Sequence, residues 1–112
     1  MALFLLMMAI CLGLCNTAQA DLPASTSGVT YEIFVGSFCD SNGDGQGDLQ
    51  GIIQQLDYLE SLHVRRIWLT PIHPSPSYHR YDVSDYMTVD PVLGSMDDFR
   101  QLVKEAKLRG ME

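Results

Sequence analysis

The spacing of apolar and polar positions along the chain predicts two strands, each followed by an amphipathic helix. Residues 29–38 (VTYEIFVGSF) are rich in β-branched and aromatic side chains, which predicts a largely buried strand. A second apolar run, RRIWLTPI from Arg65, predicts another strand, and Pro71 ends it because proline cannot donate to a sheet ladder. Trp68 lies within this run and is expected in the core.

Apolar residues at spacings of three and four positions predict the two helices. The expected apolar face of the first helix consists of Ile52, Leu56, Leu59 and either Leu62 or His63. Asp48 stands at its N-cap position. The second helix is expected to begin after Ser95, with Asp98 completing a capping box, and to end at Gly110.

The order strand, helix, strand, helix predicts an α/β fold built on a βαβ unit with parallel strands and a right-handed crossover. Two parallel strands bury neither their edges nor both of their faces. We therefore expect the chain to be the beginning of a larger α/β protein.

The first 20 residues have the pattern of a secretory signal peptide. A charge-free apolar run over residues 2–15 is followed by NTAQA, which places Ala18 and Ala20 at the −3 and −1 positions of a cleavage site. The run is shorter than the roughly 20 residues that span a bilayer. Residues 21–28 (DLPASTSG) read as a flexible lead-in. We expect a secreted or periplasmic protein without stable membrane insertion, whose domain occupies residues 29–112; a buried core helix is the alternative for residues 1–20.

The net charge restricts the classes of binding partner, and the cysteine positions restrict disulfide formation. The 112 residues carry a formal net charge of −7, which argues against nucleic acid or an anionic membrane as partner. Cys11 and Cys15 would leave with the signal peptide, so Cys39 would have no internal disulfide partner. Cys39 is therefore expected to be a small buried apolar residue.

Acidic and amide side chains at alternate positions follow the first strand, in residues 38–51 (FCDSNGDGQGDLQG). Oxygen ligands at positions 1, 3 and 5, glycine at 6 and a backbone carbonyl at 7 wrap a hard cation. From the first aspartate, the corresponding residues are Asp40, Asn42, Asp44, Gly45 and Gln46, with Asp48 at position 9. Gly51 stands where an EF-hand needs a bidentate glutamate. Two interpretations stay open: a cation site, with calcium favoured over magnesium, or an exposed turn in which Asp48 only caps the helix.

Taken together, these segments resemble the α-amylase family, glycoside hydrolase family thirteen. Residues 31–59 are similar to its first barrel strand, acidic loop and first helix, and residues 67–111 to its second strand, long loop and second helix. The form SPSYH-x-YDVSDY is most similar to secreted bacterial α-amylases with oligo-1,6-glucosidase-like features. The resemblance implies that residues 29–112 are the N-terminal βαβα portion of an incomplete TIM (β/α)8 barrel. The family's catalytic aspartate and glutamate match no position here, so no catalytic residue is expected.

The resemblance also implies two binding sites. In the family, a histidine and a tyrosine two residues later line the subsite of the sugar whose bond is cut; these are His79 and Tyr81. Tyr78 would add a further wall, and Asp82 would be a structural or substrate-side hydrogen-bond acceptor. Arg80 replaces a glycine that is common between the histidine and the tyrosine. Many members hold calcium at D-x-N-x-D-G-x-G-D, which matches all five expected ligand positions.

The implied function is the N-terminal part of a secreted retaining glycoside hydrolase acting on α-1,4-glucans, with this chain inactive by itself. An α-glucosidase, oligo-1,6-glucosidase or transglycosylase of the same family is the nearest alternative. A small non-catalytic calcium- or sugar-binding module is the alternative from another class.

Overall fold

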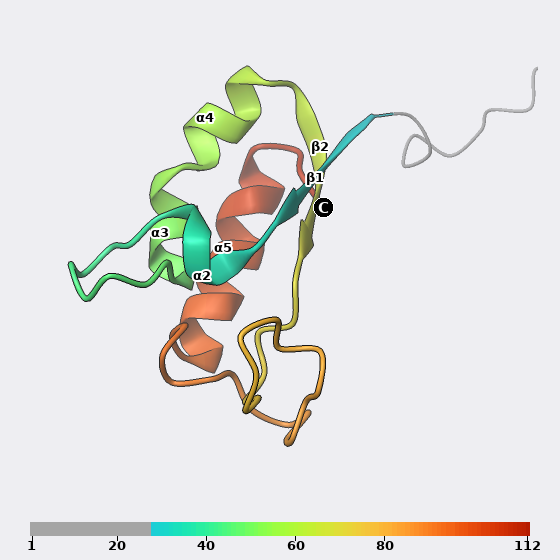
Figure 1. The fold of residues 1–112 in the computed structure, drawn as a ribbon. Coiled ribbons are helices and arrows are strands. Elements are labelled where there is room, and N and C mark those ends of the chain that lie inside the picture. Colours follow the sequence, from blue (N-terminus) through green and yellow to red (C-terminus); the bar gives the residue numbers. More distant parts are fainter. Residues whose placement is uncertain (1–27) are drawn as a thin grey trace, which may run out of the picture.

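A computed structural model describes residues 28–112 of the chain. The predicted signal peptide and most of the predicted lead-in, which fall on residues 1–27, lie outside the described residues. The elements, in chain order, are β1 (Val29–Ile33), α2 (Val35–Phe38), α3 (Leu49–Gln54), α4 (Leu56–Ser61), β2 (Val64–Leu69) and α5 (Met96–Leu108) (Figure 1).

The two strands pair in parallel, as the sequence predicts, with Tyr31 opposite Ile67 and Ile33 opposite Leu69. Helices α3, α4 and α5 lie on one side of the strands (Figure 1). The backbone of Glu112 lies alongside β2, since its N–H donates to the Arg65 carbonyl over 2.9 Å and its carbonyl accepts from the Ile67 N–H over 2.8 Å. The described residues thus form an open βαβα arrangement and not a closed barrel.

The first strand is shorter and more exposed than its sequence predicts. It ends at Ile33, which is its one buried residue, and a short helical turn, α2, follows. The carbonyls of Phe34 and Gly36 accept from the N–H groups of Ser37 and Gly47, over 3.1 and 2.9 Å. These backbone groups are therefore satisfied inside the turn and by the acidic loop, and not by a sheet ladder.

The first predicted helix is divided into α3 and α4 at Gln55. The Gln55 N–H donates to the Ile52 carbonyl three residues back, over 3.0 Å, and its φ of −103° departs from helical geometry. Ile52, Leu56 and Leu59 are nevertheless all fully buried, so the predicted apolar face is confirmed at these positions. Leu62 and His63 are exposed, so neither extends that face.

Helix α5 has the ends that its sequence predicts. The Ser95 side chain accepts from the Asp98 N–H and the Asp98 side chain accepts from the Ser95 N–H, which completes a capping box. At the other end Gly110 has φ of 70°, its N–H donates to Lys107, and the Met111 N–H donates to Ala106. These two bonds form a Schellman motif, in which the left-handed residue favours glycine.

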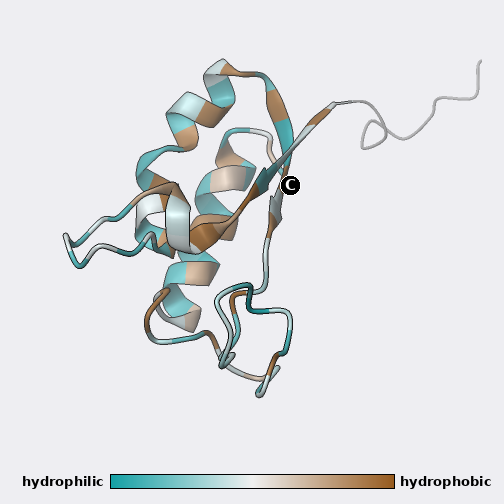
Figure 2. Ribbon diagram, in the orientation of Figure 1, coloured by the Kyte–Doolittle hydropathy of each residue, from teal (hydrophilic) through white to brown (hydrophobic). Residues whose placement is uncertain are grey.

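The core lies between the strands and the three helices. It is built from Ile33, Val35, Leu49, Ile52, Leu56, Leu59, Val64, Ile72, Val89, Leu93, Leu102, Ala106 and Met111. Hydrophobic and hydrophilic residues alternate along α4 and α5 in Figure 2, as expected for helices with one buried face. Among residues 28–112, no helix combines the length and apolar character needed to cross a membrane.

Two further predictions about burial are wrong. Trp68 is 60% exposed. It lies opposite Glu32 in the sheet, and its side chain is on the face that none of the described helices covers. Cys39 is a half-buried free thiol, and Gln55 Nε2 lies 3.8 Å from its Sγ.

Candidate functional site

The long loop between β2 and α5 begins at the carboxyl end of β2 and is held together by its own hydrogen bonds. The N–H of Asp90 donates to the Ile72 carbonyl over 2.8 Å, and the N–H of Ser84 donates to the Pro74 carbonyl over 2.9 Å. Leu93 is fully buried, and its carbonyl accepts from the Leu49 N–H at the start of α3 over 2.9 Å. The loop is therefore an ordered platform attached to the core.

His79 and Tyr81, the pair that the resemblance assigns to a sugar site, lie next to each other on this loop. Their ring centroids are 6.2 Å apart, and Tyr81 is 62% exposed. The backbone N–H of Tyr81 donates to Nδ1 of His79 over 3.2 Å. Because Nδ1 accepts this bond, the neutral ring carries its proton on Nε2, which is left as a donor. The pair therefore offers an aromatic face and a hydrogen-bond donor side by side.

Asp82 is tied to serine hydroxyls of the same loop. Its Oδ1 accepts from Oγ of Ser77 and from Oγ of Ser75, the latter over 2.7 Å. These hydroxyls, that of Ser77 above all, hold the pKa of Asp82 below its usual value. Asp82 is thus an ionised acceptor whose observed partners belong to the loop itself.

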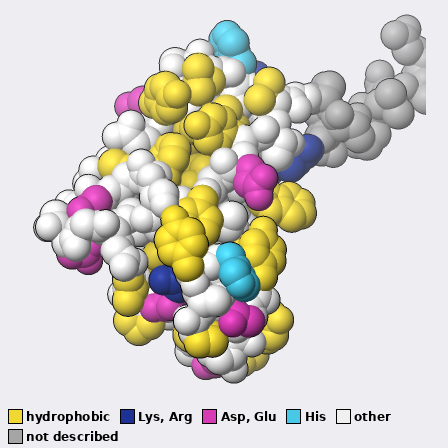
Figure 3. All heavy atoms as spheres, viewed as in Figure 1, with side chains coloured by type: hydrophobic (Ala, Val, Ile, Leu, Met, Phe, Trp, Pro, Cys, Tyr) yellow, Lys and Arg dark blue, Asp and Glu magenta, His cyan; other side chains and the backbone are white. Residues whose placement is uncertain are grey.

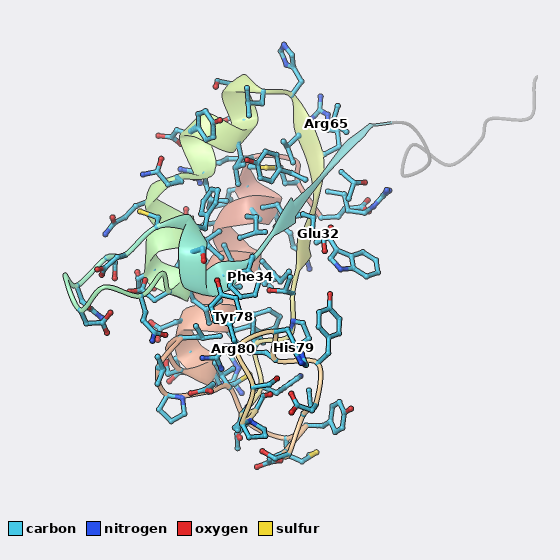
Figure 4. The ribbon with its side chains drawn as sticks, in the orientation of Figure 1. Glu32, Phe34, Arg65, Tyr78, His79 and Arg80 are labelled. Atoms are coloured by element: carbon cyan, nitrogen blue, oxygen red, sulfur yellow. The ribbon has the colours of Figure 1, made fainter. Side chains whose placement is uncertain are left out.

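Tyr78 connects the loops that follow the two strands. Its ring centroid lies 5.2 Å from that of Phe34, the residue between β1 and α2, at an interplanar angle of 37°. Figure 4 shows Phe34 and Tyr78 close together at the carboxyl end of the strands, with His79 and Arg80 just below. The contact brings residues after β1 next to the candidate sugar site.

A shallow aromatic hollow of about 310 Å³ lies between the end of β2 and the long loop. Its lining consists of Trp68, Leu69, Pro71, His73, Tyr81, Val83 and Tyr86. The rings of His73 and Tyr86 are 5.7 Å apart, and His73 Nδ1 lies 2.7 Å from the Thr88 carbonyl oxygen. Figure 3 shows hydrophobic, histidine and acidic side chains gathered over the part of the molecule where this loop lies.

The contact between Arg80 and Asp90 was not foreseen from the sequence. Arg80 has φ of 62°, in the left-handed region, and its guanidinium pairs with the Asp90 carboxylate. Burial would raise the pKa of Asp90, but the Val92 N–H and the Arg80 guanidinium together hold it below its usual value. The one available signal was the arginine itself, which stands at a position where the resemblance expects glycine.

Side-chain oxygens of the acidic loop accept hydrogen bonds from backbone N–H groups of the same loop. The Asp40 carboxylate accepts from the N–H groups of Asn42, Gly43 and Gly45 over 3.0, 2.7 and 2.8 Å. These bonds, that of Gly45 above all, hold the pKa of Asp40 below its usual value. Gly43 and Gly45 have φ of 86° and 89°, which favours glycine at both turns. Asn42 and Asp44 each accept from the N–H group two residues on.

Asp48 differs from the other expected ligands because it is buried and caps α3. One oxygen accepts from the Gly51 N–H over 2.6 Å, and the other accepts from the N–H and Oγ of Ser41 over 3.2 and 2.8 Å. A hollow of about 240 Å³ beside the loop is nevertheless lined by Asn42, Asp44 and Asp48 together.

Within residues 28–112, no group of three or more His, Cys, Asp or Glu side chains lies close enough to hold a metal ion. The expected set relies on an amide and a backbone carbonyl besides its carboxylates. A carboxylate oxygen that accepts one hydrogen bond keeps a second lone pair. The residues therefore fit calcium by donor type, and Asp48 fits it only while also serving as a cap.

Comparison with known proteins identifies the family. The profile of the family described as alpha amylase, catalytic domain, matches residues 32–112. The chain belongs to the α-amylase family. Alpha-amylase SusG of Bacteroides thetaiotaomicron is 54% identical to this α-amylase-family chain over 84 residues, which are 75% of this chain and 12% of that protein. Trehalose-6-phosphate hydrolase of Escherichia coli is 51% identical over 86 residues, 76% of this chain and 16% of that protein.

Solved structures agree with this assignment. The α-amylase from H. orenii matches with a TM-score of 0.73 at 53% identity, over 76% of this chain and 19% of its own. Trehalose-6-phosphate hydrolase from Bacillus licheniformis matches with a TM-score of 0.74 at 45% identity, over 76% of this chain and 16% of its own. The α-amylase-family chain thus spans less than a fifth of these relatives. Its βαβα arrangement is a part of the family's (β/α)8 barrel, and its family is one of glycosidases.

Proposed function

We propose that the chain is the N-terminal part of a secreted, retaining α-amylase-type glycoside hydrolase that acts on α-1,4-glucans such as starch and maltooligosaccharides. The observation that carries this proposal is the exposed His79–Tyr81 pair on the loop after β2. Active sites of (β/α)8 enzymes are built from loops at this end of the strands. The similarity to relatives named as α-amylases supports the choice of substrate. Secretion rests on the signal-peptide pattern of residues 1–20.

The two rings have complementary roles in binding a sugar. A pyranose presents an apolar face of C–H groups, against which the exposed ring of Tyr81 packs. The Nε2–H of His79 donates to a sugar hydroxyl. Retaining hydrolysis also needs a carboxylate nucleophile and a carboxylic acid, which the resemblance does not place in this chain. The 112 residues alone are therefore expected to bind sugar weakly and to hydrolyse none.

A second candidate is an α-glucosidase, oligo-1,6-glucosidase or transglycosylating enzyme of the same family. Relatives named oligo-1,6-glucosidase and trehalose-6-phosphate hydrolase are 49% and 51% identical to this chain, close to the α-amylases. A non-catalytic module is not favoured, because residues 32–112 match a catalytic-domain family.

The acidic loop is proposed to bind calcium through Asp40, Asn42, Asp44, the Gln46 carbonyl and Asp48. Its donors are all oxygens, and its two left-handed glycines let alternate side chains face one point. Bound calcium would supply a fixed positive charge that ties the loop to the start of α3. Its role would be structural, since the residues proposed to bind the sugar, His79 and Tyr81, lie on the other loop, after β2.

The substrate proposal is tested by assaying the full-length gene product on maltoheptaose, isomaltose and trehalose 6-phosphate. We expect the highest kcat/KM on maltoheptaose, and no turnover by the purified 112-residue chain. A higher kcat/KM on isomaltose or trehalose 6-phosphate would replace the α-amylase proposal with the second candidate. Absence of hydrolysis of every α-glucoside would contradict both.

A further inference from the structure

We propose that Arg80 is a positioning residue, whose pairing with Asp90 fixes the turn that presents His79 and Tyr81 to the sugar. This inference rests on the proposed function of those two side chains. The pairing of Arg80 with Asp90 is called the clasp below.

Arg80 occupies the turn between the two sugar-binding residues. Its φ of 62° lies in the left-handed region, and its N–H donates to the Ser77 carbonyl over 3.3 Å. A non-glycine residue avoids this region unless its surroundings impose it. The turn brings the neighbouring N–H of Tyr81 onto Nδ1 of His79 and so sets the relation of the two rings. Figure 4 shows Arg80 and His79 side by side on the loop.

The other half of the clasp is anchored to the base of the loop. Asp90 donates its N–H to Ile72 over 2.8 Å and accepts the N–H of Leu93 at its carbonyl over 2.9 Å. Its second carboxylate oxygen accepts from the Val92 N–H over 3.0 Å. Leu93 belongs to the core. Arg80 therefore connects the sugar-binding turn to a segment that is fixed by buried contacts.

The clasp is more than a surface ion pair. Both side chains are only 14% exposed, whereas the pair of Arg100 and Asp97 on α5 is 70% and 89% exposed. Exposed pairs contribute little, but removal of one partner from a shielded pair leaves the other charge uncompensated. Loss of the clasp should therefore release the turn, and the exposed pair provides a matched control.

The test uses the full-length gene product with maltooligosaccharides as substrate. If the two rings hold the sugar equally in the ground state and the transition state, their misplacement raises KM and leaves kcat unchanged. We expect Arg80→Ala and Asp90→Asn each to raise KM about tenfold, the effect of losing one good binding contact, with kcat within about twofold. Arg100→Ala should change neither constant.

Further variants at the two positions distinguish positioning from direct contact. Arg80→Gly loses the clasp but adopts the left-handed turn without strain, so its KM should rise less than that of Arg80→Ala. Arg80→Ala combined with Asp90→Asn should be no worse than either single variant, because both remove the same contact. If both Arg80 variants raised KM while Asp90→Asn left it unchanged, Arg80 would contact the sugar itself and the inference would be wrong. Should Arg80→Ala not fold, Asp90→Asn, which keeps the side-chain volume, gives the same comparison.

Different results would overturn the proposed glycosidase function and the proposed role of the clasp. A wild-type protein without glycosidase activity would overturn the proposed function and this inference with it. An active wild-type protein, combined with unchanged KM in both Arg80→Ala and Asp90→Asn, would overturn the clasp alone. A fall in melting temperature with unchanged KM would show a merely structural pair and would also overturn it.

Discussion

Replacing Gly51 with alanine should destabilise the protein, although alanine favours helices by about 1 kcal/mol over glycine. A Cβ at this position of α3 would lie 1.9 Å from the Cys39 carbonyl oxygen and 2.6 Å from its carbonyl carbon. Both partner atoms are backbone, so no side-chain rotation relieves the clash. The Cys39 carbonyl is also the acceptor of the Asp48 N–H over 3.0 Å, which holds it in place.

The expected magnitude follows from these opposing effects. Overpacking costs about 1–3 kcal/mol, and displacement of Cys39 would also break a hydrogen bond worth about 1 kcal/mol. After the gain in helix propensity, Gly51→Ala should lower the free energy of unfolding by about 1–3 kcal/mol. Because its carboxylate caps α3 at Gly51, Asp48 should be disturbed as well.

The matched control is Gly36→Ala in α2. A Cβ there would meet only the Phe34 ring, at 3.7 Å, which is ordinary contact. We expect its stability to stay within about 1 kcal/mol of wild type. The assay is urea unfolding of the full-length gene product, followed by circular dichroism and checked by melting temperature. Equal stability of the two variants would refute the packing argument.

Four further perturbations have defined outcomes. Ser95→Ala removes the N-cap of α5 and should cost about 1 kcal/mol in urea unfolding; an unchanged midpoint would contradict the cap. Hydrogen bonds from the Ser95 hydroxyl and, to a smaller extent, from Gln50 hold the pKa of Asp98 below its usual value. Ionised Asp98 therefore stabilises the folded protein fully above its unfolded pKa of about 4, and this stabilisation is lost as pH falls through the lower folded pKa. Asp98→Asn should therefore flatten the acid limb of the stability curve, and a limb of wild-type steepness would argue against this linkage. Leu56→Ala, at a fully buried position, should cost about 2–5 kcal/mol, and a loss below about 1 kcal/mol would mean that the site collapses. Asp44→Ala should lower the melting temperature and abolish its response to a calcium chelator, whereas a chelator response equal to that of wild type would exclude Asp44 as a ligand.

Local sequence signals predicted the elements that depend on neighbours along the chain. Asp48 and Ser95 were placed correctly as caps because their partners lie only three residues away. Ile52, Leu56 and Leu59 were placed correctly in the core because helical spacing alone puts them on one face. The parallel pairing of the strands followed from the helices between them.

Features that depend on contacts between separate segments of the chain could not be predicted from the sequence. The strand at 29–38 ends early because Gly36 bonds to Gly47 of the acidic loop, eleven residues on. Trp68 matched a buried strand pattern, but its exposure depends on what covers that face of the sheet. The clasp joins Arg80 to a partner ten residues away across an irregular loop, where no periodicity indicates which side chains meet.

The loop after β2 is proposed to hold an α-glucan against Tyr81, and a kinetic comparison of two tyrosine variants measures this contact. Tyr81→Ala is compared with Tyr58→Ala, which removes the same ring from α4, where it is 49% exposed. Loss of one stacked ring should lower kcat/KM of the full-length gene product on maltoheptaose by about tenfold or more in Tyr81→Ala, and Tyr58→Ala should match wild type. Equal kcat/KM in the two variants would show that Tyr81 does not hold the glucan.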